Sequence, residues 1–186
     1  MTKRSGYQGL VNQFLNASTN EILGELTLAQ GGSVEELQRN AWIKQIAILK
    51  KILSPYLDGF IAFEFTIPRM GKRVDNLFIY KDLILVLEFK VGSDKYDRHA
   101  IQQVTDYSLD LKNFHQGSHA AKIIPILVAT DGPTKFSELS FSEDLVAVPL
   151  LSNSSNLEVI IENVIRNCDH QKSISHSKWL NSGYCP

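Results

Sequence analysis

The chain has 186 residues, of which 44% are hydrophobic and 21% are charged, and its formal net charge is −1. This composition indicates a globular protein with a sizeable core, and the balanced charge argues against a protein that coats nucleic acid or a membrane through its overall charge. The two cysteines, Cys168 and Cys185, have no CxxC spacing. They therefore predict neither a disulfide framework nor a zinc site, and they favour a reducing compartment.

The N-terminus, MTKRSGYQGLVNQ, lacks the apolar core of a secretion signal. The longest apolar run, LILVLEF, is too short to cross a bilayer. We therefore expect a cytoplasmic protein.

Helices are predicted in the first third of the chain. Two capping boxes of the form S-x-x-E, at 18–21 and 33–36, predict two helix starts. Gly31 and Gly32 should end the first helix, and Pro55 should end the second. The core face of the second helix is predicted from its spacing of apolar residues: Leu37, Ala41, Ile43, Ile46, Leu49 and Ile52.

Three strand-like runs follow, at 60–67, 73–80 and 83–90. The rest of the chain predicts a helix over about 97–114, a strand over 122–129, a second strand over 144–150 and a last helix over 157–167. This order predicts an α/β fold, with a mixed central sheet flanked by helices on both faces.

The predicted organisation has three parts. Residues 1–55 form a helical segment that packs on the core, residues 56–170 form the core itself, and residues 171–186 form a tail. The tail ends on WLNSGYCP, which predicts either a segment that folds back onto the domain or a chain that continues further.

Charged residues near the ends of the second and third strands point to a site. If Lys81 and Asp82 form a two-residue hairpin loop, Asp75 lies opposite Glu88, with Cβ atoms about 5 Å apart on one side of the sheet. Like charges so placed repel each other unless a cation lies between them. Two carboxylates on rigid strands suit Mg²⁺ or Mn²⁺, and Lys90 shares the Glu88 face. The alternative is a salt-bridge cluster of these residues with Arg73, without catalysis.

The helix over 97–114 places Gln103 and Tyr107 four residues apart, so that both side chains project together toward the sheet. A glutamine amide near the carboxylates could hold a phosphate, a water molecule or a metal ligand. The alternative is that these polar residues only cap the edge of the core.

The combination of Asp75, Glu88-Phe89-Lys90 and Gln103-x-x-x-Tyr107 resembles the PD-(D/E)XK nuclease superfamily, in its branch with a Q-x-x-x-Y motif like that of RecB-type exonucleases. More narrowly, residues 35–150 resemble the N-terminal nuclease-like domain of bacterial Schlafen-type helicase/ATPase proteins.

This resemblance implies a restriction-endonuclease-like fold and a Mg²⁺- or Mn²⁺-dependent hydrolase that cuts DNA phosphodiester bonds. Asp75 and Glu88 would bind the metal together with the backbone carbonyl of Phe89, and Lys90, Gln103 and Tyr107 would complete the catalytic set. Many members add a glutamate from an upstream helix. In this sequence the candidates for that role are Glu35, Glu36 and Glu64, while Lys44 and Gln45 occupy the later turn of that helix.

The chain has no phosphate-binding loop of the ATPase type. The resemblance therefore implies that an ATPase/helicase domain lies beyond Pro186 and delivers single-stranded or forked DNA to this domain. It also implies a setting in DNA repair or antiviral defence. A catalytically inactive nucleic-acid-binding or motor-docking module on the same fold, and an RNA nuclease, stay open as alternatives, as does a homo-oligomer.

Basic residues border the predicted site and could neutralise backbone phosphates, or could simply form a solvated surface. The candidate nucleic-acid contacts are Arg69, Lys72, Arg73, Lys95, Arg98, Lys112 and His115.

Overall fold

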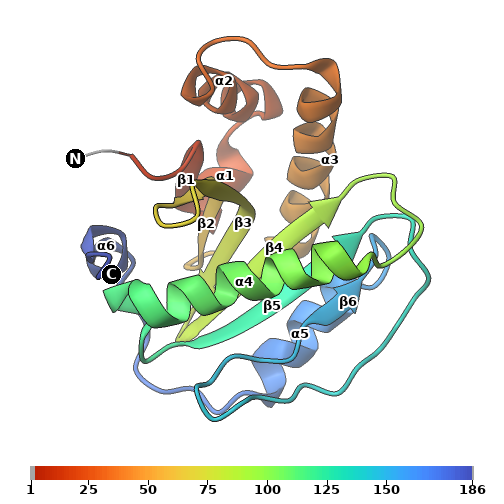
Figure 1. Ribbon diagram of the computed structural model, residues 1–186. Coiled ribbons are helices and arrows are strands. Elements are labelled where there is room, and N and C mark those ends of the chain that lie inside the picture. The colour runs from red at the N-terminus through yellow and green to blue at the C-terminus, as the bar shows by residue number, and fades with distance from the viewer. Residues whose placement is uncertain (1–2, 186) are drawn as a thin grey trace.

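A six-stranded sheet forms the centre of the computed structural model, which describes residues 3–185 (Figure 1). The strands follow one another across the sheet in chain order: β1 (Tyr7–Leu10), β2 (Phe60–Ile67), β3 (Lys72–Tyr80), β4 (Leu83–Lys90), β5 (Lys122–Ala129) and β6 (Leu150–Ser152). The pairs from β1 to β4 are antiparallel, whereas β4–β5 and β5–β6 are parallel. The predicted α/β class with a mixed sheet is confirmed.

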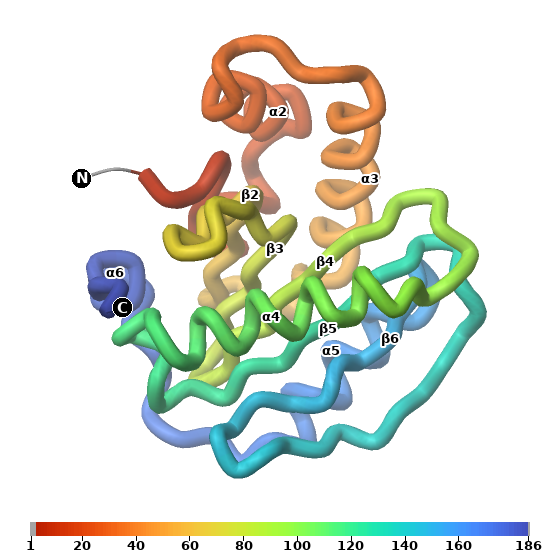
Figure 2. Tube along the Cα trace, viewed as in Figure 1, coloured from red at the N-terminus to blue at the C-terminus, as the bar shows by residue number. Residues whose placement is uncertain are grey.

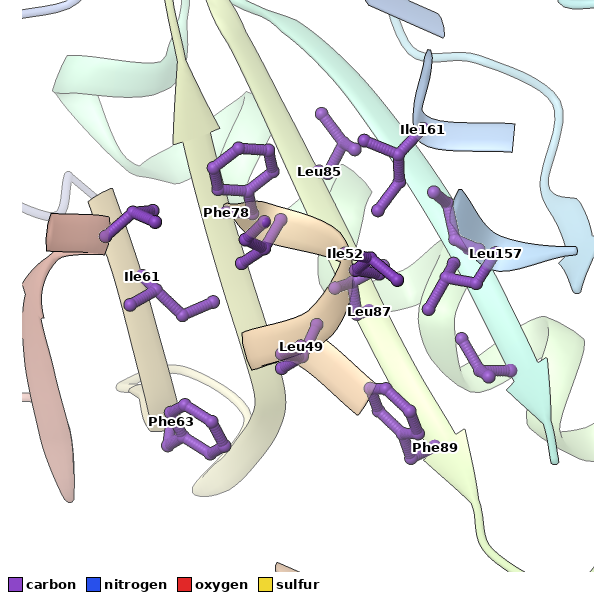
Figure 3. Packing of buried hydrophobic residues seen from close by; sticks show 14 of the residues in the cluster. Leu49, Ile52, Ile61, Phe63, Phe78, Leu85, Leu87, Phe89, Leu157 and Ile161 are labelled. Carbon is purple, nitrogen blue, oxygen red and sulfur yellow. The ribbon is translucent and has the colours of Figure 1, made fainter. Parts of the chain in front are cut away.

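Helices cover both faces of the sheet (Figure 1). They are α1 (Val11–Asn16), α2 (Thr19–Ala29), α3 (Glu36–Leu53), α4 (Arg98–Phe114), α5 (Leu157–Asn167) and α6 (His176–Asn181), with a 3₁₀ turn at Gln116–Ser118. Helices α3 and α5 pack on one face, where Leu49 and Ile161 meet side chains of the strands (Figure 3). Helix α4 and Trp179 of α6 pack on the other face.

Strand β4 is buried on both faces, as its continuous apolar run predicts. Leu85 and Leu87 belong to the core beneath α3 and α5, whereas Ile84 and Val86 belong to the core beneath α4. Because β4 lies near the middle of the sheet, residues at its C-terminal end are held on a rigid support.

The predicted helix boundaries are only partly correct. Ser18 and Glu21 form the expected capping box at the start of α2. The box predicted at Ser33 is wrong, because α3 begins after Glu35, whose side chain makes no capping bond within the described chain. The predicted core face of α3 is also wrong at Leu37 and Ile43, which are 82% and 37% exposed.

The first 55 residues contribute more than helices. Tyr7–Leu10 forms edge strand β1 on β2, which the sequence pattern did not reveal. At the other end of the sheet, the strand predicted at 144–150 forms only isolated bridges at Val146 and Ala147, and the ladder begins at Leu150.

The tail folds back onto the domain. Trp179 of α6 is 1% exposed and packs against Phe65 and His115. In Figure 2, α6 lies beside the C-terminal end of α4. None of the helices among residues 3–185 is long and apolar enough to span a membrane.

The β3–β4 hairpin has the predicted register over most of its length. Ile79 pairs with Ile84 and Leu77 pairs with Val86, so the two-residue loop is confirmed. The ladder between the described strands ends at Asn76–Leu87, one step before the expected pair of Asp75 with Glu88. Continuing the same register would align Arg73 with Lys90, and this pair is likewise not part of the ladder.

The backbone of β2 is irregular at Glu64, on the strand next to the end of the β3–β4 ladder. Glu64 has a φ of +53°, a conformation that L-residues other than glycine rarely adopt. Residues two apart share one face of a regular strand, but Phe63 and Phe65 lie in different cores. The side chains of β2 therefore change faces at Glu64, beside the position of Asp75 on β3.

Candidate functional site

Asp75 and Glu88 line a single cleft of about 1000 Å³ at the open end of the β3–β4 hairpin, together with Lys90. The Asp75 carboxylate accepts a hydrogen bond of 2.8 Å from the backbone N–H of Phe89. The strands therefore bring the two acids together without a regular ladder pair between them.

A chain of hydrogen bonds links β4 to α4 on one side of the cleft. The Nζ of Lys90 donates to Glu88 Oε1 and to Gln103 Oε1, both at 3.2 Å. Gln103 Nε2 donates to the hydroxyl of Tyr107 at 2.8 Å. All four of these predicted site residues are therefore joined in one network, because positions 88 and 90 share a strand face and positions 103 and 107 share a helix face.

Burial disfavours the charged forms of both acids, and a neighbouring carboxylate adds to this effect. Burial raises the pKa of Asp75 well above its ordinary value, and the neighbouring Glu88 raises it further, while the Phe89 N–H acts in the opposite direction. Burial also raises the pKa of Glu88, although Lys90 partly opposes this. One lysine does not fully compensate two carboxylates that share a buried site.

Two oxygen atoms in this region lack a protein partner. Glu88 Oε2 and Gln45 Oε1 are buried, and neither accepts a hydrogen bond from any residue between 3 and 185. Gln45 is 2% exposed and projects from α3 into the same cleft. Buried acceptors without partners are rare in folded proteins, so these two oxygen atoms are candidates to bind a ligand.

Gln45 is a candidate functional residue that the sequence pattern did not single out. It lies on the buried side of α3, between Trp42 and Leu49. A polar residue among apolar positions at helical spacing was the available signal, but only the packing of α3 on the sheet shows where the amide points.

The three candidate glutamates do not line the cleft. Glu35 and Glu36 stand at the exposed start of α3. The carboxylate of Glu64 accepts a hydrogen bond of 2.9 Å from Trp42 Nε1 and pairs at 3.4 Å with Arg73. Glu64 thus has an ion-pair role beside the site.

The cleft has two chemically different walls. Helix α3 supplies an apolar and amide wall through Leu37, Gln38 and Asn40. The segment between β4 and α4 and the first turn of α4 supply the other wall, which carries the exposed Lys95 and His99 respectively. In Figure 1 this segment rises from the end of β4 beside α3.

Two of the predicted phosphate contacts are corrected by the structure. His115 is fully buried, and its ring nitrogens lie at 2.7 Å from Ser118 Oγ and 2.9 Å from Ser182 Oγ. Burial lowers its pKa to about 4, so it is neutral at physiological pH. Lys112 is 8% exposed and donates to the carbonyl of Ala121. Both residues secure the chain after α4, and neither presents charge to a ligand.

The remaining basic candidates do not form one patch. Lys95 and Arg98 are exposed at the start of α4. Arg69 lies at the other end of this helix, where its guanidinium is 3.8 Å from the centre of the Phe114 ring. A helix of this length puts its two ends about 25 Å apart, so Arg69 is far from Arg98. Lys72 is exposed at the start of β3, and Arg73 pairs with Glu64.

The donor set at the hairpin end consists of oxygen atoms. Within the described residues, no group of three or more His, Cys, Asp or Glu side chains could hold a metal ion. The available donors are instead two carboxylates, the amide oxygen of Gln45 and backbone carbonyls, with a lysine beside them. Comparison of the chain with protein-family models, with curated proteins and with solved structures finds no match.

Proposed function

We propose that the chain is a divalent-metal-dependent nuclease that hydrolyses DNA phosphodiester bonds at the cleft containing Asp75 and Glu88. The observation that carries this proposal is the meeting of two under-compensated carboxylates with Lys90 in one open cleft. Such perturbed acids gather at functional sites more often than at ordinary surfaces.

The residues fit a hard divalent cation, Mg²⁺ or Mn²⁺. Asp75 and Glu88 would hold it, and Glu88 Oε2 is a carboxylate oxygen without a partner among residues 3–185. The carbonyl of Phe89 is the third proposed ligand. A bound cation of this kind polarises a phosphodiester and lowers the pKa of a bound water molecule.

Lys90 is proposed as the catalytic cation. A protonated lysine has three N–H donors, and two of these are directed to Glu88 and Gln103. The third is available for the attacking water molecule or for a phosphate oxygen, where positive charge stabilises the developing negative charge. Gln103 and Tyr107 would hold Lys90 in this position.

The two walls of the cleft suggest how a strand would lie. Lys95 and His99, together with the neighbouring Arg98, would contact the phosphates, whereas Leu37 and the amides of the α3 wall would contact bases. A wall that contacts base faces suits unpaired nucleotides, which favours single-stranded or forked DNA.

The wider assignment rests on the resemblance in the sequence. The proposed family is the Q-x-x-x-Y branch of the PD-(D/E)XK nucleases, with a restriction-endonuclease-like fold. The mixed sheet flanked by helices is compatible with that fold. A downstream ATPase/helicase domain, a cytoplasmic location and a setting in DNA repair or defence belong to the same proposal.

The test is a nuclease assay on single-stranded DNA, double-stranded DNA and matched RNA, with Mg²⁺, with Mn²⁺ and with EDTA. We expect metal-dependent cleavage of DNA that falls at least about a thousandfold in Asp75→Asn and in Lys90→Met, because each change removes a group placed on the reacting atoms. Asp58→Asn, which alters an exposed acid near the start of β2, is the matched control and should cleave like the wild type. Cleavage that survives in either site variant would refute the proposal.

A non-catalytic module is favoured by one specific observation. Lys90 and Glu88 form an ion pair at 3.2 Å, which by itself can account for the presence of both charges. In that case the wild type would bind nucleic acid but would cleave neither DNA nor RNA under any metal condition. RNA cleavage without DNA cleavage would instead identify a ribonuclease.

A further inference from the structure

A second recess lies on the other side of Glu64 from the cleft. It has a volume of about 80 Å³ and is bounded by the segment before β1, the end of α2 and the neighbouring parts of β2 and β3. In Figure 2 the N-terminal segment runs in from the left, between α2 and the β2–β3 turn. A recess of this volume has room for a small ion such as phosphate.

The recess is rich in positive charge. Its lining includes Lys3, Arg4 and Arg73 and the carboxylate of Glu64. Lys3 also pairs with Glu25 at 3.1 Å, and Arg4 donates to the carbonyl of Ser182, so Arg73 is the cation best placed to meet a ligand. The oxygens of Glu64 are already engaged by Trp42 and Arg73. Arg73 uses Nε for this pair at 3.4 Å, which leaves the other donors of its guanidinium for a second anion.

A buried hydroxyl in the recess independently indicates a missing ligand. Ser5 is 4% exposed, and its Oγ has no hydrogen-bond partner anywhere in residues 3–185. The backbone around it is fixed, because Gly6 N–H donates to Phe63 and the carbonyl of Arg4 accepts from Thr66. Because buried hydroxyls in folded proteins are nearly always hydrogen-bonded, a ligand is expected to supply the partner of Ser5.

The recess lies close to the proposed catalytic cleft. Arg73 is two residues before Asp75 on β3, which places their Cα atoms about 6–7 Å apart. This matches the rise of about two nucleotides along one strand of DNA. Gln38, which lines the cleft, reaches Glu64, which lines the recess, at 3.5 Å.

We infer that this recess binds one phosphate group of the nucleic-acid strand, held by Arg73 and the Ser5 hydroxyl. The phosphate anchors the strand one or two nucleotides from the bond that is cut. This inference rests on the proposed nuclease function for the source of the phosphate, whereas the anion site itself rests only on the residues of the recess.

The experiment measures binding in EDTA, so its result does not depend on cleavage. The first probe is inorganic phosphate, whose binding is measured as a change in the melting temperature of the protein. The second probe is a single-stranded oligonucleotide, compared with a 5′-phosphate and with a 5′-hydroxyl. Its binding is measured by fluorescence anisotropy. The variants are Ser5→Ala and Arg73→Ala, with Ser54→Ala and Arg166→Ala as exposed controls of the same chemistry.

We expect inorganic phosphate to raise the melting temperature of the wild type and of both controls. Ser5→Ala and Arg73→Ala should weaken phosphate and oligonucleotide binding about tenfold each, the size expected for the loss of one hydrogen bond to a charged group. Ser5→Ala should melt no lower than the wild type without phosphate, because it removes an unpaired hydroxyl. It therefore keeps the test valid if Arg73→Ala does not fold.

Each outcome decides the inference. Tighter binding of the 5′-phosphorylated strand that is lost in Ser5→Ala supports a terminal phosphate, and equal weakening of both strands supports an internal one. A phosphate response without any change in oligonucleotide affinity overturns the nucleic-acid assignment and leaves a site for free phosphate. No phosphate response and unchanged oligonucleotide binding in both variants overturns the site itself. If the site binds phosphate but the wild type cleaves nothing, the proposed function fails and the anion site stands.

Discussion

The two ends of the β3–β4 hairpin each carry acidic side chains away from solvent, but the two ends differ in how far the acidic charge is compensated. At the tip, Asp82 receives hydrogen bonds from Lys122, from His170 and from the backbone N–H of Gln171, at 2.9–3.2 Å. At the open end, Asp75 and Glu88 share one lysine.

The pKa values reflect this difference. Burial acts to raise the pKa of Asp82, but the bonds from Gln171, His170 and Lys122 outweigh it and the pKa is lowered. Burial is not outweighed at Asp75, and the pKa is raised. The contacts at the tip therefore stabilise the charged form of Asp82. At the open end the negative charge is not fully compensated, and a bound cation would compensate it.

Binding of Mn²⁺ should separate the two ends most strongly. At a Mn²⁺ concentration of 100 times Kd, linkage predicts about 2.7 kcal/mol of added stability for the wild type. Thermal or urea unfolding with and without Mn²⁺ measures it. The gain should vanish in Glu88→Gln and persist in Asp82→Asn relative to the metal-free baseline of each variant. A wild type that does not respond across millimolar Mn²⁺ would mean that the open end is only a salt bridge.

Asp82→Asn should lower the free energy of unfolding by roughly 2 kcal/mol, because it leaves Lys122 and His170 without their carboxylate. Urea unfolding at neutral pH measures this. The exposed change Asp58→Asn is the control and should have an effect within about 0.5 kcal/mol. A loss of that small size in Asp82→Asn would show that the tip is not the stabilising end.

Asp75→Asn should have the opposite sign and raise the free energy of unfolding by about 1 kcal/mol in EDTA. It removes a repelling charge while keeping a side-chain oxygen that can accept from Phe89 N–H. The same urea titration measures it. Destabilisation in EDTA would contradict the view that this carboxylate is retained for function at a cost in stability.

The pH dependence should show the smallest effect and again differ in sign. The lowered pKa of Asp82 contributes stability above the unfolded value of about 4, and this contribution is lost as pH falls below it. The raised pKa of Asp75 makes the wild type lose stability as pH rises from about 4 through the folded pKa.

Unfolding measured in EDTA between pH 3 and pH 7 tests both signs. The stability of Asp75→Asn should diverge upward from that of the wild type as pH rises. The stability of Asp82→Asn should converge on that of the wild type as pH falls below about 4. Parallel curves for the wild type and both variants would contradict the assigned shifts.

Much of the candidate site could be predicted because strand and helix periodicity is local. The spacing of Glu88 and Lys90 puts both on one face of β4, and Gln103 and Tyr107 lie one helical turn apart. The hairpin register followed from the two-residue loop. None of these relations needs a contact between distant segments beyond the hairpin itself.

Other features depended on contacts that sequence periodicity does not contain. The sequence predicted that Lys112 and His115 are exposed basic residues. The chain at Ala121 covers Lys112, and the helix that carries Trp179 covers His115. Leu37 read as a core residue, yet no described element covers it, and it lines the cleft instead.

By itself, the sequence determined the α/β class, the central hairpin, and the residue types and spacing of the network at its open end, because these follow from short-range geometry and burial of apolar faces. Only the tertiary structure decided that the three other candidate glutamates stay outside the cleft and that Gln45 and Ser5 are buried without partners in residues 3–185. It also decided which cations reach solvent. The physical reason is that burial and charge compensation are set by neighbours far away in the chain, whose approach depends on the whole packing of helices on the sheet.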